Sequence, residues 1–422
     1  MELITEKYKV SDFGILPSAW EVFNINQISV LKARIGWQGL TTAEYLSMGE
    51  YFLVTGTDFD DGKIKWETCN FVSKDRFLQD KNIQLKIDDI VITKDGTIGK
   101  VGFIDSLPME ATLNSGVFVV RLKSSEFSPL YLYYIFNSKY FDHFLRELVA
   151  GSTINHLYQK DFVHFSFPSP SNVPEQTAIA TTLRDTDALI NSLEKLIEKK
   201  RAMREVAIRT LLTGNKRLDG FKGEWKEKLF PEVCWYQEGP GLRNWQFTTD
   251  GIKVINVTNL EDDYLNLDRT SRFISWYEFD KMYKHFEINS GDIVVASSGN
   301  SYAKVAVVRD QDLPLVMNTS VIRFKPLKNL YYYFLLAFLK SKFFKDQIDL
   351  MITGGAQPNF GPFHLNRILI KVPPTMDEQQ QIADILRDID MEIEELRCKS
   401  SKYKLIKQGM MQNLLTGKIR LV

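Results

Sequence analysis

The feature that most constrains this chain is a segment that occurs twice. Residues 174–218 and 377–421 align without a gap at an offset of 203 residues. Both copies have Glu-Gln near the start, Leu-Arg-Asp followed by a second Asp, and Leu-Leu-Thr-Gly near the end. Solenoid repeats are about 20–50 residues long. A period of 203 residues therefore indicates two copies of a whole unit, each a globular part followed by a long helix.

Each copy of this segment has the apolar periodicity of an amphipathic helix. Apolar side chains recur every three or four residues, and charged side chains occupy the positions between them. The positions expected to pair the helices are Leu183, Ile190 and Leu193 in the first copy and Leu386, Ile393 and Leu396 in the second. Polar side chains interrupt the stripe at Lys200, Arg204, Ser400 and Lys407. We expect a short antiparallel coiled coil, with two separate core helices as the alternative.

The ends of both helical stretches carry recognisable signals. Pro174 and Pro374 come before the two stretches, and Asp377 has the side chain of an N-cap residue. Gly214 and Gly417 stand where a left-handed residue commonly follows a helix. The predicted helices span residues 175–213 and 378–416.

The segments between the helices predict two related globular parts. Both contain short runs rich in Val, Ile and Phe, separated by turns that contain Gly, Asn, Asp and Ser. Strands are predicted within residues 51–56, 89–105 and 116–122 of the first part, and within 253–260, 292–308 and 320–326 of the second. One helix is predicted near the end of each part, at 128–148 and 330–350.

The predicted fold class is α+β. Two similar domains, residues 1–170 and 218–374, alternate with two helical regions, residues 171–217 and 375–422. The repeat predicts a molecule with pseudo-two-fold symmetry, in which the two long helices pair as an antiparallel coiled coil.

Composition excludes several classes of protein. The 53 basic and 53 acidic residues give no net charge, which argues against binding nucleic acid by bulk electrostatics alone. The three cysteines lack the spacing of a zinc site or a disulfide framework. The N-terminal sequence has no apolar signal core, and the apolar and aromatic run at 330–339 is half as long as a membrane span. We expect a cytoplasmic protein without a membrane partner.

We find no catalytic motif in the sequence. The run GTIGKVG at 96–102 does not match a phosphate-binding loop, because its glycine spacing differs and the pattern after it is that of a strand. The five histidines form no i, i+4 pair for a metal. The Asn/Asp-Pro-Pro-aromatic motif with which amino methyltransferases hold a target base is missing. We therefore expect no catalytic residues, no metal and no cofactor.

Polar loops with interleaved aromatic side chains recur at equivalent places in the two domains. They are residues 151–157 and 354–360, residues 93–100 and 296–304, and residues 34–42 and 236–247. Such loops contain the side chains that contact base edges and phosphates, but they are also ordinary surface turns. The candidate DNA contacts are Lys94, Thr97, Lys100, Thr153 and Asn155 in the first domain, and Arg243, Asn300, Lys304, Gln357 and Asn359 in the second.

The repeated helices, and the stretch from GSTINHL to FPSP at 151–170 that leads into the first of them, resemble the specificity subunit of a type I restriction-modification system. The resemblance covers nearly the whole chain and rests on the alternation of two recognition domains with two related helical regions. The lead-in is Pro-Ser-Pro at 168–170, where the second copy has Pro-Pro at 373–374.

The resemblance implies a non-catalytic subunit that binds no cofactor. Each recognition domain would read one half of a bipartite, asymmetric target in double-stranded DNA. The paired helices would set the spacing of the halves and dock two modification subunits, which bind S-adenosylmethionine and methylate adenine. ATP-dependent restriction subunits would join the complex to cleave DNA.

Two other functions stay open on sequence alone. A non-catalytic adaptor of two α+β domains would bind proteins rather than DNA, and a basic patch that spans both domains would favour DNA instead. A free-standing methyltransferase is disfavoured because the target-base motif is missing.

Overall fold

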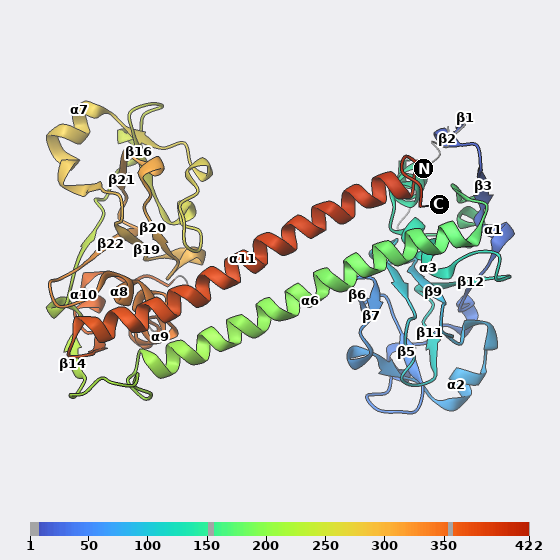
Figure 1. Cartoon of the computed structure of the whole chain (residues 1–422), viewed down its shortest axis with the longest axis horizontal. Helices are drawn as coiled ribbons and strands as arrows, with labels where there is room; N and C mark the ends of the chain where they lie inside the picture. The colour runs from blue at the N-terminus through green and yellow to red at the C-terminus, as the bar shows by residue number, and fades with distance from the viewer. Residues whose placement is uncertain (1–7, 151–155, 353–357, 422) are drawn as a thin grey trace. The chain divides into compact units, whose positions relative to one another are not determined.

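The computed structural model describes residues 8–150, 156–352 and 358–421. The chain forms two compact units: unit 1 comprises residues 1–194 and 399–422, and unit 2 comprises residues 195–398. Each unit combines strands and short helices with parts of the two long helices, α6 (Val173–Leu211) and α11 (Met376–Leu414) (Figure 1). The predicted α+β class is confirmed.

Unit 1 contains a four-stranded antiparallel sheet with the strand order β10-β9-β12-β4. Its strands are β4 (Ser29–Ala33), β9 (Ile90–Thr93), β10 (Val101–Phe103) and β12 (Val117–Leu122). A second sheet has the order β11-β5-β8, with β5 (Phe52–Val54), β8 (Asn70–Phe71) and β11 (Ala111–Leu113). A separate pair joins β3 (Trp20–Asn24) to β13 (Ser166–Pro170).

Unit 2 repeats this topology, with one more strand in its second sheet. Its four-stranded sheet has the order β15-β22-β19-β20, with β15 (Cys234–Glu238), β19 (Ile293–Ala296), β20 (Val305–Val307) and β22 (Val321–Pro326). Its second sheet joins β16 (Ile252–Ile255), β17 (Phe273–Ile274), β18 (Glu287–Ile288) and β21 (Leu315–Met317). β14 (Lys226–Leu229) pairs with β23 (Leu369–Val372) as β3 pairs with β13. The strands predicted from the sequence lie in these sheets.

Alternate side chains of the central sheet build two different cores in unit 1. Ile90 and Ile92 of β9 pack in a cluster that includes Leu183 of α6, whereas Val91 packs in the cluster of the second sheet. Successive side chains of a strand point to opposite faces. Because both faces of β9 are covered, apolar side chains suit both, which explains the unbroken apolar run at 90–92.

The single helix predicted near the end of each domain is wrong, because each stretch forms two helices. Unit 1 has α3 (Pro129–Phe136) and α4 (Lys139–Ala150), and unit 2 has α8 (Tyr332–Leu339) and α9 (Lys342–Met351). Ser341 ends one helix and caps the next, since its hydroxyl donates to the Phe338 carbonyl and accepts from the Phe344 N–H. The serine at 138 likewise donates to the carbonyl of residue 135.

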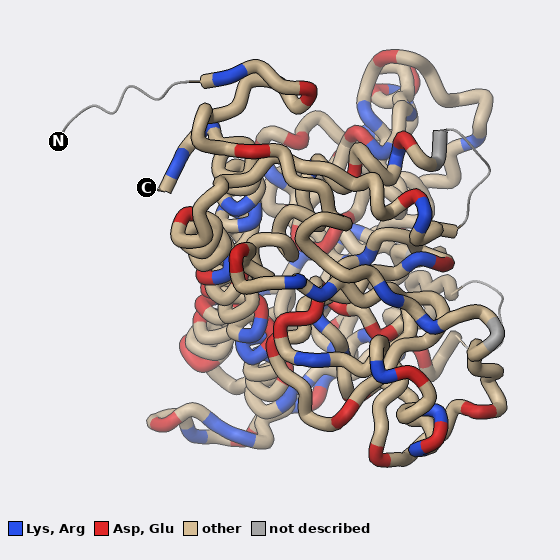
Figure 2. The backbone as a smooth tube through the Cα atoms, turned by 90° about the vertical axis from the view of Figure 1, so that its right-hand side faces the viewer, with Lys and Arg blue, Asp and Glu red and all other residues tan. Residues whose placement is uncertain are grey.

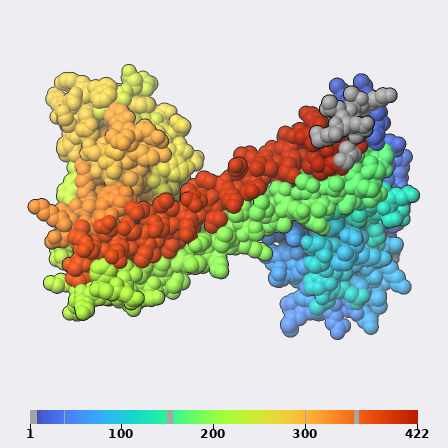
Figure 3. Space-filling model, viewed as in Figure 1, coloured from blue at the N-terminus to red at the C-terminus, as the bar shows by residue number. Residues whose placement is uncertain are grey.

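The long helices run antiparallel in both units. In unit 1, Asp187 of α6 pairs with Lys407 of α11 at 2.5 Å, and further along α6 Glu194 pairs with Lys404 at 2.6 Å. Residue numbers thus rise on one helix as they fall on the other, and Figure 3 shows these parts of α6 and α11 side by side. In unit 2, residues 200 and 204 of α6 pair with residues 392 and 390 of α11 in the same sense.

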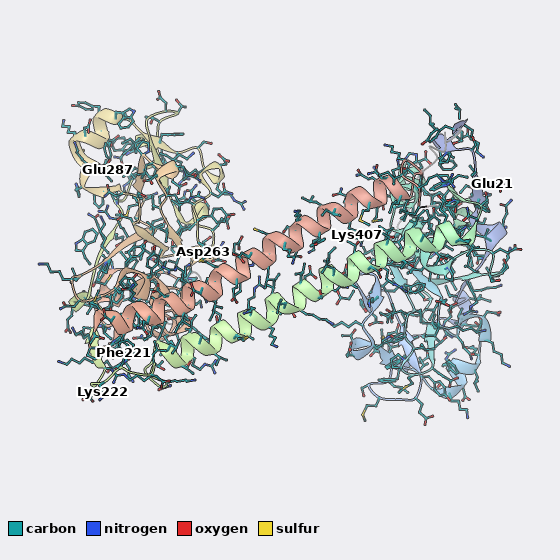
Figure 4. The ribbon with its side chains drawn as sticks, in the orientation of Figure 1. Glu21, Phe221, Lys222, Asp263, Glu287 and Lys407 are labelled. Carbon is teal, nitrogen blue, oxygen red and sulfur yellow. The ribbon has the colours of Figure 1, made fainter. Side chains whose placement is uncertain are left out.

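The apolar stripe is the buried face of each long helix, and Leu183 and Leu386 pack in the cores of unit 1 and unit 2. Leu183, Ile190, Leu193, Leu386 and Ile393 are buried, and Leu396 is half-buried. The polar residues that interrupt the stripe are also accommodated. Lys200, Arg204 and Lys407 form ion pairs between α6 and α11, and Ser400 is buried. Figure 4 labels Lys407, one of these residues, on α11.

Both long helices begin and end two residues earlier than predicted, and Pro174 lies inside the first turn of α6. Asp377 lies inside the first turn of α11, and the cap is Thr375, whose hydroxyl accepts from the Glu378 N–H at 3.3 Å. Gly214 and Gly417 adopt the predicted left-handed conformation, with φ of 72° and 70°.

An equivalent buried cluster holds the start of each long helix. In unit 1, the Glu175 carboxylate accepts from the Trp20 indole at 3.4 Å and from Arg420 at 2.7 Å. In unit 2, the carboxylate of residue 378 accepts from the indole of residue 225 at 3.2 Å and from the guanidinium of residue 217 at 2.8 Å. The two residues that donate to the carboxylate in unit 2 lie close together in sequence. Trp20 and Arg420, which donate to the carboxylate in unit 1, come from opposite ends of the chain.

Candidate nucleic-acid interface

In unit 1, loops that are distant in sequence meet at one end of the four-stranded sheet. The Leu157 N–H donates to the Lys94 carbonyl at 2.8 Å, and the Lys94 N–H donates to the Gly116 carbonyl at 2.9 Å. Asp95 and His156 form an isolated antiparallel bridge. The structure therefore brings together two of the three predicted loop segments of this domain.

The same meeting point exists in unit 2. The Phe360 N–H donates to the Ser297 carbonyl at 3.0 Å, and Ser298 and Asn359 form an isolated antiparallel bridge. The Gly239 N–H donates to the Val321 carbonyl at 3.1 Å, so the third predicted loop starts at this edge as well. The bridges of the two units lie at the repeat offset of 203 residues.

The turn that follows β9 is held by its own polar groups. The Thr93 hydroxyl donates to the Thr97 carbonyl at 2.5 Å and accepts from the Lys100 N–H at 2.9 Å. Gly96 and Gly99 have φ of 67° and 84°, a conformation that favours glycine because other side chains clash there. The turn therefore presents the exposed Thr97 and Lys100 on a defined backbone.

The turn that follows β19 is similar but one residue longer, because Lys304 lies eight residues after Ala296 whereas Lys100 lies seven after Thr93. Gly299 and Ala303 have φ of 71° and 65°, close to the values of the two glycines in unit 1. The Tyr302 hydroxyl donates to Asp349 of α9 at 2.8 Å and ties the turn to the domain. Hydrogen bonds from Lys345 and Tyr302 lower the pKa of the Asp349 carboxyl, although burial opposes this shift.

A third element displays polar and aromatic side chains on an anchored turn in unit 2. Leu242 and Gln246 are buried, and the three residues between them, which begin with Arg243, are exposed. The Gln246 side chain accepts from the Arg243 N–H at 2.8 Å and donates to the Tyr283 hydroxyl at 2.9 Å. Trp245 is 81% exposed, which is unusual for so large an apolar side chain.

Trp245 was not among the residues predicted from the sequence, although a repeated dipeptide could have indicated it. The dipeptide Trp-Gln occurs at 37–38 and 245–246, and in both units it lies in a short 3-10 turn, η1 (Gly36–Gln38) and η6 (Asn244–Gln246). The dipeptide therefore occupies a backbone turn of the same kind in each unit.

The ten predicted contacts differ in their surroundings. Thr97, Lys100, Arg243 and Asn359 are exposed. Lys94 is half-buried, and its ammonium lies 5.4 Å from the centre of the Phe118 ring. The described residues exclude Thr153, Asn155 and Gln357, and of Asn300 only the backbone is described, in η11 (Gly299–Ser301).

Lys304 already has an internal partner. Its ammonium lies 3.3 Å from the Glu261 carboxylate, and hydrogen bonds from Lys304 and Arg269 lower the pKa of Glu261. A phosphate at Lys304 would have to compete with this carboxylate. Lys100 is therefore the better placed of the two equivalent lysines.

The described residues contain no group of side chains arranged as a metal site. Within residues 8–150, 156–352 and 358–421 no three His, Cys, Asp or Glu side chains are grouped to hold a metal ion. Burial raises the pKa of the Cys69 thiol to about 12, so this group stays protonated and unreactive.

No helix among the described residues is long and apolar enough to cross a membrane. Basic and acidic residues are interspersed along the backbone (Figure 2).

Comparison with known proteins confirms the resemblance. The chain is 27% identical over 453 residues to the type I restriction enzyme MjaVIII specificity subunit of Methanocaldococcus jannaschii, across 100% of this chain and 99% of that protein. It is 25% identical over 442 residues to the putative type I restriction enzyme MjaX specificity subunit of the same organism, across 98% and 97% of the two chains.

The solved structures share the fold. The S subunit of a type I restriction-modification system from M. genitalium aligns with a TM-score of 0.60 at 18% identity, across 97% of this chain and 99% of that chain. The model of the type I restriction modification DNA specificity domain matches residues 17–200 and 222–400. These two matches cover most of the sequence, and the chain therefore belongs to the family of type I restriction modification DNA specificity domains.

Proposed function

We propose that this chain selects the DNA sequence for a type I restriction-modification complex. Each of two recognition domains, residues 1–170 and 218–374, reads one half of a bipartite, asymmetric target. The helical regions, residues 171–217 and 375–422, hold the spacing of the halves. The chain contributes recognition, and its partners contribute the chemistry.

One observation carries the proposal: each unit has the same loop edge, with different side chains on it. The bridges, the left-handed turns and the Trp-Gln turns recur in both units. The same backbone arrangement occurs in both units, but it carries different exposed polar side chains. Such an arrangement suits two domains that recognise different base sequences. The exposed groups are hydrogen-bond donors and acceptors of the kinds that contact bases and phosphates.

The absence of net charge fits a shared interface with DNA. Each phosphate contact by Lys or Arg releases counterions and strengthens binding. A chain with 53 basic and 53 acidic residues has no general excess of such contacts. In the proposal, modification subunits therefore supply much of the phosphate binding, and this chain supplies the base contacts.

The long helices are the proposed docking surface for two modification subunits. Both helices expose large apolar side chains: Leu196, Met203 and Val206 on α6, and Met391 and Leu405 on α11. In the proposal, these exposed apolar side chains contact the modification subunits. The modification subunits bind S-adenosylmethionine and methylate adenine, and ATP-dependent restriction subunits join this assembly.

The test is selection from a library of random DNA duplexes by the complex of this chain with its modification subunits. We expect enrichment of one two-part sequence and methyl transfer to adenine within it. The purified chain alone should transfer no methyl group. A complex that binds every duplex alike would contradict the proposal and would favour the adaptor function.

Two variants separate base contacts from phosphate contacts. Lys100→Ala should weaken binding to all duplexes and lower the slope of log affinity against log salt by about one. Asn359→Ala should cost about 1–3 kcal/mol and relax the preference at one base pair. Lys123 is the control, because it follows β12 at the end of the sheet opposite to Gly116, and Lys123→Ala should change neither quantity.

A further inference from the structure

The two isolated bridges place different chemistry on the same backbone. In unit 1 the bridged residues are Asp95 and His156, and in unit 2 they are Ser298 and Asn359. Both residues of unit 2 lie 203 positions after their equivalents in unit 1. Each unit thus presents one pair of polar side chains at the meeting point of two loops, and the pairs share no residue type.

The backbone at the two bridges is similar in the two units. The same hydrogen bond joins the neighbouring residues, from residue 157 to residue 94 at 2.8 Å and from residue 360 to residue 297 at 3.0 Å. The glycines that follow, Gly96 and Gly299, have φ of 67° and 71°. Unit 2 keeps this geometry with a hydroxyl and an amide, so the bridge does not require the acid and imidazole of unit 1.

The unit 1 pair is accessible, and its two side chains are in contact. The Asp95 Oδ1 atom is in contact with His156 Nδ1, and these side chains are 43% and 31% exposed. The His156 ring lies 4.4 Å from the ring of Tyr158, and the Lys160 ammonium lies 5.5 Å from that ring. The contact between Oδ1 and the imidazole orients the carboxylate, whose remaining lone pairs accept hydrogen bonds.

An acid at a surface that meets DNA needs an explanation, because it repels phosphates. A carboxylate accepts a hydrogen bond from the cytosine N4 amino group and repels the guanine and thymine acceptors of the major groove. Such a group therefore selects against wrong bases more than it strengthens binding. The amide of Asn359 has a donor and an acceptor, which match the N6 and N7 atoms of adenine.

We propose that these bridged pairs are specificity-determining residues, one pair for each half of the target. Asp95, oriented by His156, accepts a hydrogen bond from a cytosine in the half read by unit 1. Asn359, beside Ser298, contacts an adenine in the half read by unit 2. This inference rests on the proposed function, and it adds Asp95, His156 and Ser298 to the candidate contacts.

The test transplants the pair of unit 2 into unit 1. The double variant Asp95→Ser with His156→Asn, in complex with the modification subunits, is presented with a library of random duplexes. We expect the preference to change by about tenfold or more at one base pair of one half, with the other half unaltered. The reciprocal variant Ser298→Asp with Asn359→His should change one base pair of the other half.

The control is a chemically similar pair outside the loops. His143 and Glu147 of α4 lie 3.2 Å apart and are 70% and 67% exposed. His143→Asn with Glu147→Ser should leave the preferences of both halves unchanged. A shift in this control as large as that in the transplant would contradict the assignment.

Other outcomes separate this inference from the proposed function. A wild-type complex that selects no sequence contradicts the proposed function. A wild-type complex that selects a two-part target, together with transplants that select the same target, contradicts only the role of the bridged pairs. If neither transplant assembles, the pairs hold the fold together and the inference is also wrong.

Discussion

Glu175 is a buried carboxylate whose charge is compensated by residues from both ends of the chain. Its side chain is 1% exposed. Burial alone would raise its pKa, but hydrogen bonds from Arg420, Trp20 and Asn172, together with the charge of Arg420, outweigh burial and lower it. A lowered pKa in the folded state means that ionised Glu175 stabilises the fold, because the folded state holds the proton less tightly than the unfolded chain.

The stabilisation that Glu175 provides should depend on pH. Glu175→Gln should lower the free energy of unfolding by roughly 3 kcal/mol near pH 7, because it removes the negative charge of a buried carboxylate that accepts hydrogen bonds from Arg420. The stabilisation by the ionised carboxylate is complete above the unfolded pKa of about 4.3 and falls as pH drops through the lower folded pKa. The difference between variant and wild type should therefore shrink below about pH 4 in denaturation measurements. Glu21→Gln, at an exposed position, is the control (Figure 4).

Two glycines of unit 1 should respond to the same substitution with opposite signs. A Cβ at Gly417 would lie 2.6 Å from Pro17, and the left-handed φ of 70° strains any other residue. Gly417→Ala should therefore destabilise the chain by about 2 kcal/mol or more. Gly409 lies within α11 with no atom near its ideal Cβ, and Gly409→Ala should stabilise by about 0.5–1 kcal/mol. Equal effects on the melting temperature would contradict this account.

At the scale of helices and strands, the apolar pattern of the sequence predicted the long helices and the buried strands. It did not predict the features that depend on tertiary contacts. The stripe of 183, 190 and 193 identified the buried face of α6, and apolar runs identified β9 and β12. The breaks at Ser138 and Ser341 stayed hidden because aromatic residues continue on both sides of each serine. The bridge of Asp95 with His156 could not be predicted, since nothing local joins residues so far apart.

Aspartate substitutions in the long helices should destabilise the chain more, the more deeply the replaced leucine is buried. Leu193→Asp should cost roughly 3–5 kcal/mol, because Leu193 is 6% exposed and an aspartate there would have no partner. Leu396→Asp should cost less, since this side chain is half-buried. Leu405 of the same helix is 69% exposed, and Leu405→Asp should change the free energy of unfolding by less than about 0.5 kcal/mol.

The Leu405 variant also separates stability from docking. If α11 binds a modification subunit through its exposed apolar residues, Leu405→Asp should weaken assembly of the complex while the chain alone unfolds as before. Denaturation of the chain and titration with the modification subunit measure the two effects. A loss of stability without a loss of assembly would place Leu405 in the fold rather than in the docking surface.

At the scale of the whole molecule, the two units have separate cores. The clusters around β9 and β12 contain residues of unit 1, and those around β19 and β22 contain residues of unit 2. Substitutions in sites that share no contacts usually have additive effects. A change of base preference in one domain should therefore leave the preference of the other unaltered.

Exchange of a complete domain is the strongest test of this independence. Replacing residues 219–374 by the corresponding domain of another specificity subunit should replace one half of the target and keep the other. The core of unit 2 includes Ile208, Leu211, Ile382 and Leu386 of the long helices, so these positions stay as they are in the exchange. Selection from a random duplex library by the assembled complex gives both halves in one measurement. If both halves change, recognition depends on the arrangement of the domains and not on the loop edge of each, and the separate assignment of reading residues to each unit would fail with it.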